Sequence, residues 1–163
     1  MGLIVVVSSP SGGGKTTVVN ALLERNRNFV RSVSYTTRPI KHSEKHGGDY
    51  HFVSESEFRR LIKKGFFAEY ADVHGYLYGT PKHTIKRYAA GGKDAFFVID
   101  VKGGLAVKKL FPDAVLVFVA PPGIKELIKR LNRRNRETPG EIRRRISRMK
   151  YEFGQGKKYD YCI

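Results

Sequence analysis

The chain has 163 residues and a formal net charge of +16, with 31 Lys and Arg against 15 Asp and Glu. This length predicts one domain that buries a core of its own. No apolar run is long enough for a membrane span, and no secretory signal peptide is expected. The single cysteine, Cys162, excludes an internal disulfide and favours a reducing, cytoplasmic setting.

The positive charge is concentrated in one segment. Residues 125–150 carry eleven of the 31 basic residues and only three acids, which is half of the net excess. Three interpretations remain open at this point. The segment is a solvated basic face, a surface for nucleic acid, or a segment that closes over a polyphosphate.

The first predicted elements are a buried strand over about 3–8 and a helix from Lys15 to about Arg25. The residues between them read Ser-Ser-Pro-Ser-Gly-Gly-Gly-Lys-Thr-Thr from position 8 to position 17. A strand, a glycine loop and a Lys-Thr pair that opens a helix form the pattern of a phosphate-binding P-loop. The alternative is a glycine-rich turn before an ordinary helix.

The chemistry of the P-loop explains these residue types. Backbone N–H groups wrap the phosphates, which glycine permits because it has no side chain, and the N-terminus of the helix adds further donors. Lys15 is expected to reach the β- and γ-phosphates, and the Thr16 hydroxyl to bind Mg²⁺. Ser9 departs from the pattern, which has Gly there. The predicted ATP-binding residues are Ser11, Gly12, Gly13, Gly14, Lys15, Thr16 and Thr17.

The middle of the chain reads differently. Residues 29–53 are turn-rich and extended, and Ser54 opens a short helix that ends at Gly65. Residues 66–80 are aromatic and β-like, and a helix over about 81–90 follows. In a nucleotide-binding fold, an insertion at this position is where a second substrate would bind.

The parallel pattern then resumes. A buried strand at 95–99 ends on Asp100, a helix covers about 103–110, and a strand covers 115–119. Two helices complete the chain, one at 123–135 and one that Thr138 caps. Alternating strands and helices predict an α/β fold with a mostly parallel β-sheet flanked by helices.

Two blocks in the middle of the chain resemble guanylate kinases. The first is Ser-Val-Ser-Tyr-Thr-Thr-Arg at 32–38, with Glu44, Gly47 and Asp49-Tyr50 after it. The second is Phe-Phe-Ala-Glu-Tyr-Ala-Asp-Val-His-Gly at 66–75, with Tyr78-Gly79-Thr80 after it. The resemblance runs from residue 3 to residue 163 and continues through Ile99-Asp100-Val101, Pro121-Pro122, Arg134 and Arg145. These blocks are far more restrictive than a P-loop alone.

The resemblance implies a P-loop kinase that transfers a phosphoryl group from ATP to GMP, with dGMP as a weaker acceptor and Mg²⁺ as the cofactor. It also implies one domain in three regions. The core covers about 1–30, 93–122 and 151–163, a small, mostly β GMP-binding insertion covers about 31–92, and a helical lid covers about 123–150. The family's last strand end and helix have no counterpart within these 163 residues. No membrane or nucleic-acid partner is expected, and the oligomeric state is left open.

The chemistry of the matching residues agrees with that substrate. A phosphate monoester needs hydrogen-bond donors, and guanine offers two donors to a carboxylate and one acceptor to a hydroxyl. Adenine would leave the carboxylate unpaired, which is a strong basis for discrimination. The resemblance assigns the phosphate to Ser34, Arg38, Lys41, Tyr50 and Tyr78, and the base to Glu69, Thr80 and Asp100.

Asp100 has two interpretations, since its carboxylate could bind the guanine amino group, a Mg²⁺ ion through water, or both. Lys41 stands where the family usually has a second phosphate-binding arginine. Other departures are Tyr76, Lys102 and Ser43. The histidines His42, His46, His51 and His74 lack a metal-ligand spacing.

Phosphoryl transfer from ATP to a phosphate needs positioning and charge neutralisation, and no general base. The expected catalytic residues are Lys15 and Arg38, with Arg134 and Arg145 from the lid. The remaining arginines of the basic segment are expected to be solvated, namely Arg133, Arg136, Arg143, Arg144 and Arg148. Two alternatives stay open, an inactive guanylate-kinase-like interaction module and a nucleic-acid-binding P-loop protein.

Overall fold

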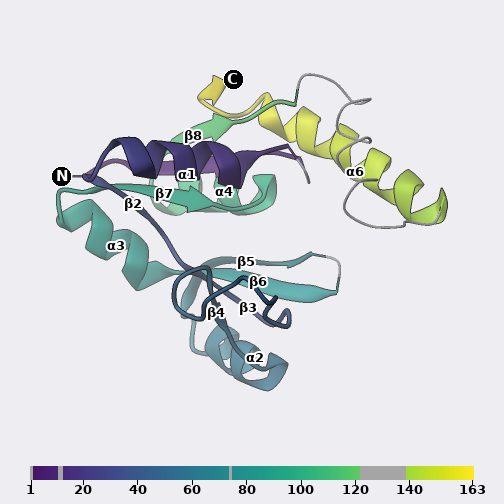
Figure 1. Ribbon diagram of the computed structural model, residues 1–163, viewed down its shortest axis with the longest axis horizontal. Helices are drawn as coiled ribbons and strands as arrows, with labels where there is room; N and C mark the ends of the chain where they lie inside the picture. Colours follow the sequence, from purple (N-terminus) through teal and green to yellow (C-terminus); the bar gives the residue numbers. More distant parts are fainter. Residues whose placement is uncertain (1, 11–12, 74, 122–138) are drawn as a thin grey trace.

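A five-stranded parallel sheet forms the core, in the order β2-β7-β1-β8-β9 (Figure 1). Its strands are β1 (Ile4–Ser8), β2 (Phe29–Arg31), β7 (Asp94–Val98), β8 (Val115–Phe118) and β9 (Tyr161–Cys162). The computed structural model describes residues 2–10, 13–73, 75–121 and 139–163, excluding the side chains of 139–145. The predicted α/β class with a parallel sheet is confirmed.

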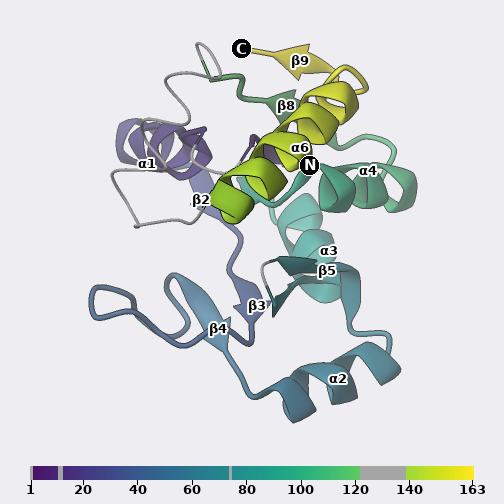
Figure 2. The ribbon, with the colours of Figure 1, turned by 90° about the vertical axis from the view of Figure 1, so that its right-hand side faces the viewer.

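The helices that accompany this sheet in the described part of the chain are α1 (Lys15–Arg25), α3 (Lys82–Ala90), α4 (Val101–Leu110) and α6 (Pro139–Gly156). The alternation of side chains along β1 decides which helix covers which face. Ile4 and Val6 join the cluster that includes α3 and α4, whereas Val5 and Val7 pack with α1. Figure 2 shows α1 and α4 on opposite sides of the sheet.

A smaller sheet lies beside the core, in the order β4-β3-β6-β5. It comprises β3 (Ser34–Thr36), β4 (Tyr50–Phe52), β5 (Phe67–Val73) and β6 (Tyr76–Pro81), with helix α2 (Glu55–Lys63) next to it. Ser54 caps the N-terminus of α2, where the sequence predicts a helix to open, because its Oγ accepts a hydrogen bond of 3.2 Å from the Glu57 N–H. In the view of Figure 1 the small sheet and α2 lie below the core, and β5, which contacts α4, is the strand of the small sheet nearest to the core.

Helix α6 crosses in front of the core in the view of Figure 2. Met149 of α6 is buried, and Phe153 packs against Phe118 of β8 with their ring centroids 5.8 Å apart. The helix expected at 123–135 and the predicted cap at Thr138 lie outside the described residues. In the described part of the chain, no helix has the length and apolar character needed to cross a bilayer.

Candidate active site

The P-loop leaves the carboxyl end of β1, where parallel α/β sheets commonly bind ligands. Gly14 has a φ of 95° and caps α1, which begins at Lys15. The Lys15 ammonium donates to the Ser9 carbonyl at 3.2 Å, across the base of the loop. Burial lowers the pKa of Lys15, and the carboxylates of Glu152 and Asp100 partly oppose that shift. Ser11 and Gly12 lie outside the described residues.

Ser9, which stands at the glycine position of the P-loop pattern, packs beside Gly13. Its side chain is buried, and its Oγ donates to the Pro10 carbonyl at 3.1 Å. A Cβ atom added to Gly13 would lie only 1.7 Å from that Oγ. The serine therefore fits because residue 13 is a glycine, so the two positions depend on each other.

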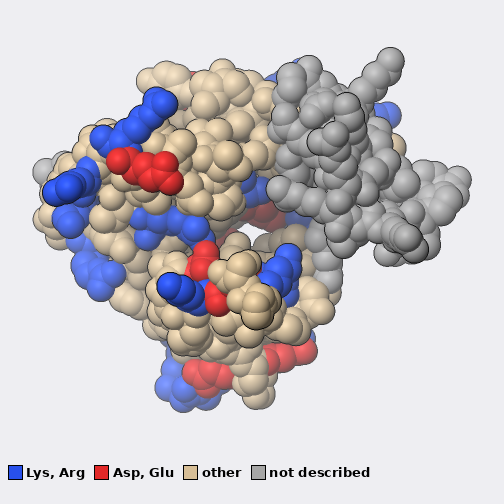
Figure 3. All heavy atoms as spheres, viewed as in Figure 1, with Lys and Arg blue, Asp and Glu red and all other residues tan. Residues whose placement is uncertain are grey.

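One cavity of about 360 Å³ joins the P-loop to the small sheet. It brings together most of the residues that the sequence assigned to the two nucleotides. From the loop and α1 come Gly13, Gly14, Lys15, Thr16 and Thr17, and from the acceptor set come Ser34, Tyr50, Glu69, Tyr78 and Asp100. Figure 3 shows a hollow between the core and the small sheet, with basic and acidic side chains at its rim.

Glu69 of β5 is held from two sides. The Thr80 hydroxyl of β6, itself fully buried, donates to Glu69 Oε1 at 2.5 Å. On the other side, a Cβ atom on Gly103 would lie 2.6 Å from Glu69 Oε2. Burial, with a smaller contribution from Asp100, raises the pKa of Glu69 to about 7. The carboxyl group is thus fixed in place, and near neutral pH it exchanges between its protonated and its ionised form.

Arg38 lies beside the cavity and does not line it. Its guanidinium pairs with Glu44 at 2.7 Å and sits 5.7 Å from the ring centroid of Tyr50. This pairing holds the pKa of Glu44 below its usual range. Glu44 Oε2 also accepts from the backbone N–H of Lys41 at 2.9 Å, while the Lys41 side chain is exposed. Glu44 therefore organises the loop that presents both cations, a role that was not predicted from the sequence.

Asp100 lies between β7 and α4. Its Oδ1 accepts from the Gly103 N–H at 2.8 Å, which makes it the N-cap of α4. The helix consequently begins at Val101 and not at 103 as predicted. The other oxygen, Oδ2, lies 3.5 Å from Nη2 of Arg148.

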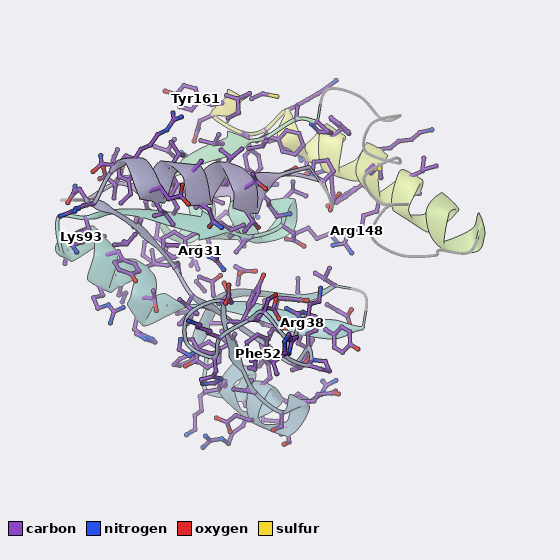
Figure 4. All side chains as sticks on the ribbon, viewed as in Figure 1. Arg31, Arg38, Phe52, Lys93, Arg148 and Tyr161 are labelled. Carbon is purple, nitrogen blue, oxygen red and sulfur yellow. The ribbon has the colours of Figure 1, made fainter. Side chains whose placement is uncertain are left out.

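Arg148 and Glu152 of α6 line the cavity, and the sequence did not predict either as a site residue. Arg148 was expected to be solvated, but it is half-buried and pairs with both Asp100 and Glu152. The reason is a contact between distant segments of the chain, because α6 packs against α4 and this packing turns residues 148 and 152 toward the site. Figure 4 shows Arg148 reaching from α6 toward the cleft, with Arg38 on the opposite side.

A buried hydrogen-bond chain supports the base of the P-loop. The Tyr159 hydroxyl donates to Ser8 Oγ at 2.7 Å, and Ser8 Oγ donates to the Ile99 carbonyl at 2.9 Å. A Cβ atom on Gly104 would lie 2.1 Å from the Tyr159 hydroxyl oxygen. The Gly103-Gly104 pair inside a helix was the one sequence signal for this close packing, since glycine disfavours helix interiors.

The donors around Thr16 fit a magnesium ion. The Thr16 hydroxyl and the Asp100 carboxylate line the same cavity, and Mg²⁺ prefers oxygen ligands together with substrate phosphates. Within the described ranges, His, Cys, Asp and Glu form no cluster of three or more with metal-binding geometry. His74 lies outside the described residues.

Two departures from the family pattern can be placed. Lys102 lies with its ammonium 5.4 Å from the ring centroid of Tyr151, so it contacts α6. Tyr76 is exposed at the start of β6. Arg134 lies outside the described residues, and Arg145 belongs to α6 in a stretch whose side chains are not described.

A P-loop at the carboxyl edge of a parallel sheet, facing a second polar subsite across one cavity, defines a P-loop nucleotide-binding protein of the kinase type. The family model described as guanylate kinase matches residues 1–163. The chain therefore belongs to the guanylate kinase family.

Individual relatives agree over nearly the whole chain. A guanylate kinase of Chelativorans sp. (strain BNC1) is 43% identical over 163 residues, which covers 99% of this chain and 75% of that protein. One from Myxococcus xanthus is 42% identical over 163 residues and is covered to 78%. The crystal structure of guanylate kinase from Anaplasma phagocytophilum has a TM-score of 0.81 at 36% identity, covering 99% of this chain and 76% of that one.

Proposed function

We propose that the protein transfers the γ-phosphoryl group of ATP to GMP, forming ADP and GDP, and that it accepts dGMP more weakly. The observation that carries this proposal is the single cavity that contains both the P-loop and Glu69. If ATP binds with its phosphates on the P-loop and GMP binds with its base on Glu69, the γ-phosphate of ATP and the phosphate of GMP would meet inside this cavity. The relatives named guanylate kinase support the same reaction.

The acceptor side divides into a base subsite and a phosphate subsite. Glu69 would accept from the two N–H donors of guanine, and the Thr80 hydroxyl, which donates to Glu69 in the free protein, would turn its proton to the guanine carbonyl oxygen. Asp100 is the second candidate acceptor for the base. The monophosphate would bind Ser34, Tyr50, Tyr78 and Arg38, with Lys41 as a further cation from the same loop.

The transfer step needs little covalent chemistry from the protein. The acceptor phosphate is already ionised, so the chain supplies alignment and positive charge. Lys15 provides one charge at the P-loop, and we assign Arg134 and Arg145 to the same task from their positions in the basic segment. In this proposal residues 31–92 form the acceptor region and residues 123–150 form a lid that excludes water.

Mg²⁺ would be held by Thr16 and by Asp100, directly or through water, together with the phosphates of ATP. When bound, it would neutralise the charge between the β- and γ-phosphates. We propose a cytoplasmic location, where ATP is available and where the exposed thiol of Cys162 would stay reduced. The presence of Lys15, Thr16 and Arg38 supports an active enzyme over an inactive interaction module.

The experiment that tests the proposal measures ADP release with purified protein, ATP and Mg²⁺. GMP, dGMP, AMP, CMP and UMP are offered in turn as acceptors. Turnover should be fastest with GMP, slower with dGMP, and near the background of ATP hydrolysis with the other three. Equal turnover of AMP and GMP would overturn the assignment of the base subsite.

A further inference from the structure

The cavity contains more negative charge than a site for two polyanions would be expected to have. Glu69, Asp100 and Glu152 all line it, and the described cations that line it are Lys15 and Arg148. Acidic groups beside a triphosphate site repel the ligand unless a cation neutralises them. The arrangement of Arg148 therefore bears directly on nucleotide binding.

Arg148 joins two of these acids. Its Nε lies 3.2 Å from Glu152 Oε1, and its Nη2 lies 3.5 Å from Asp100 Oδ2. One guanidinium thus connects a residue of α6 with the N-cap of α4. Because a guanidinium presents its donors in a fixed plane, it can face two carboxylates at once.

Of the two acids, Glu152 depends more strongly on the positive charge of Arg148. It is only 4% exposed, and within the described part of the chain its Oε2 has no hydrogen-bond partner. Burial raises its pKa, and the charges of Arg148 and Lys15 oppose that shift. A buried carboxylate of this kind is costly when its counter-ion is removed.

Lys15 completes the cluster. The negative charges of Glu152 and Asp100 raise the pKa of Lys15, whereas the positive charge of Arg148 lowers it. If Arg148 were absent, Lys15 would be the remaining described cation in the cavity facing both acids. It would then be drawn toward the carboxylates and away from a phosphate on the loop.

We propose that Arg148 is a positioning residue for nucleotide binding, which neutralises Asp100 and Glu152 so that Lys15 is left free to bind the triphosphate. The inference rests on the proposed function in so far as the ligand of the P-loop is ATP. It does not depend on the identity of the acceptor. It also assigns α6 a part in the donor site that is independent of Arg134 and Arg145.

The test is a double-mutant cycle that uses binding as its readout. The dissociation constant of a non-hydrolysable ATP analogue with Mg²⁺ is measured by calorimetry for the wild type, Arg148→Met, Glu152→Gln and the double variant. Arg148→Lys tests whether charge alone is sufficient. Lys150→Met is the matched control, because Lys150 is an exposed cation on the same helix and does not line the cavity. Thermal unfolding is recorded for every variant.

If Arg148 acts by neutralising the two acids, the dissociation constants of the variants should differ in a specific way. Arg148→Met should weaken analogue binding by about tenfold, and the same change in the Glu152→Gln background should weaken it by less than about threefold. Arg148→Lys should bind more weakly than the wild type but more tightly than Arg148→Met, because an ammonium keeps the charge and cannot face both carboxylates at once, and Lys150→Met should bind like the wild type. If Arg148→Met does not fold, the double variant and Arg148→Lys still carry the comparison.

Three outcomes would overturn the proposal. An equal loss from Arg148→Met in both backgrounds would mean that Arg148 contacts the nucleotide itself. A fall in the unfolding temperature without any change in the dissociation constant would mean that the ion pair only stabilises α6. An equal loss in Lys150→Met would mean that diffuse positive charge is responsible. Because GMP is absent from the measurement, failure of the acceptor assignment would leave this result unaffected.

Discussion

The carboxyl group of Glu69 titrates near neutral pH because it is buried between Thr80 and Gly103. In the proposed complex, two N–H donors of guanine require the ionised form. The free protein has a Glu69 pKa of about 7. Below this pH most of the carboxyl group is protonated, and protonation competes with guanine binding. Guanine binding should therefore strengthen as the pH rises through this value.

We expect the dissociation constant of guanosine to be about tenfold larger at pH 6 than at pH 8, because most of Glu69 is protonated at the lower pH. Guanosine is the better probe, since it lacks the titrating phosphate of GMP. Calorimetry over this range, with Glu69→Gln as the control, measures the effect. A pH-independent constant in the wild type would show that Glu69 does not bind the base.

Lys41 is the second residue with a specific prediction. Its exposed ammonium is a single point charge, whereas an arginine could contact two phosphate oxygens at once. Lys41→Arg should lower the KM for GMP by about two- to fivefold and leave the KM for ATP unchanged. Steady-state kinetics test this, and Lys45→Arg, a change of the same type on the same loop, should have no effect. An unchanged or higher KM for GMP would place Lys41 away from the phosphate.

At the scale of the elements, the packing of α4 against β5 is what fixes Glu69. Gly103 has no room for a Cβ atom, which would lie 2.6 Å from Glu69 Oε2. Gly103→Ala should therefore raise the KM for GMP by about tenfold or more and spare the KM for ATP, although alanine is the better helix former. Gly154→Ala in α6 is the control, because no atom of the described residues lies within 4 Å of its added Cβ. Equal kinetics for both variants would contradict the account.

The basic segment carries the next prediction. We expect Arg134→Ala and Arg145→Ala each to reduce kcat by about 10³-fold, the effect of an arginine that stabilises phosphoryl transfer. Arg143→Ala should be near neutral, since an isolated surface charge contributes little. Measured kcat values for the three variants separate these roles. Similar, modest losses in all three would mean that the segment acts only through its overall charge.

Most elements could be predicted because their signals are local. The apolar run before the P-loop, the Ser54 cap of α2 and the aromatic hairpin of β5 and β6 all lie within a few consecutive residues. The start of α4 was misplaced by two residues, because the Asp100 side chain caps the helix and extends it. A carboxylate at the end of a strand does not reveal by itself that it also begins the next helix.

On the scale of the whole molecule, the residues that the sequence missed depend on contacts between distant segments. Glu152 and Arg148 reach the cavity because α6 packs on α4, and no pattern within α6 marks these two side chains. Glu44 likewise shows its role only when the loop brings Arg38 and the Lys41 amide together. Tertiary placement, and not residue type, selects one basic side chain from a crowded segment.

The cations at the described site do not account for the net charge of +16. Arg38 is paired with Glu44, and Arg148 with Asp100 and Glu152, so these cations at the site are already matched by acids. A site for two polyanions then combines neutralised acids with the free charge of Lys15.

The central claim is that Glu69 selects the acceptor base in the cavity that it shares with the P-loop. The most direct test is kcat/KM for GMP and for AMP in the wild type and in Glu69→Gln, with the KM for ATP recorded alongside. The wild type should prefer GMP by about 10⁴-fold or more, and Glu69→Gln should lose most of that preference while the KM for ATP stays constant. A Glu69→Gln variant that keeps the wild-type preference for GMP would contradict the account.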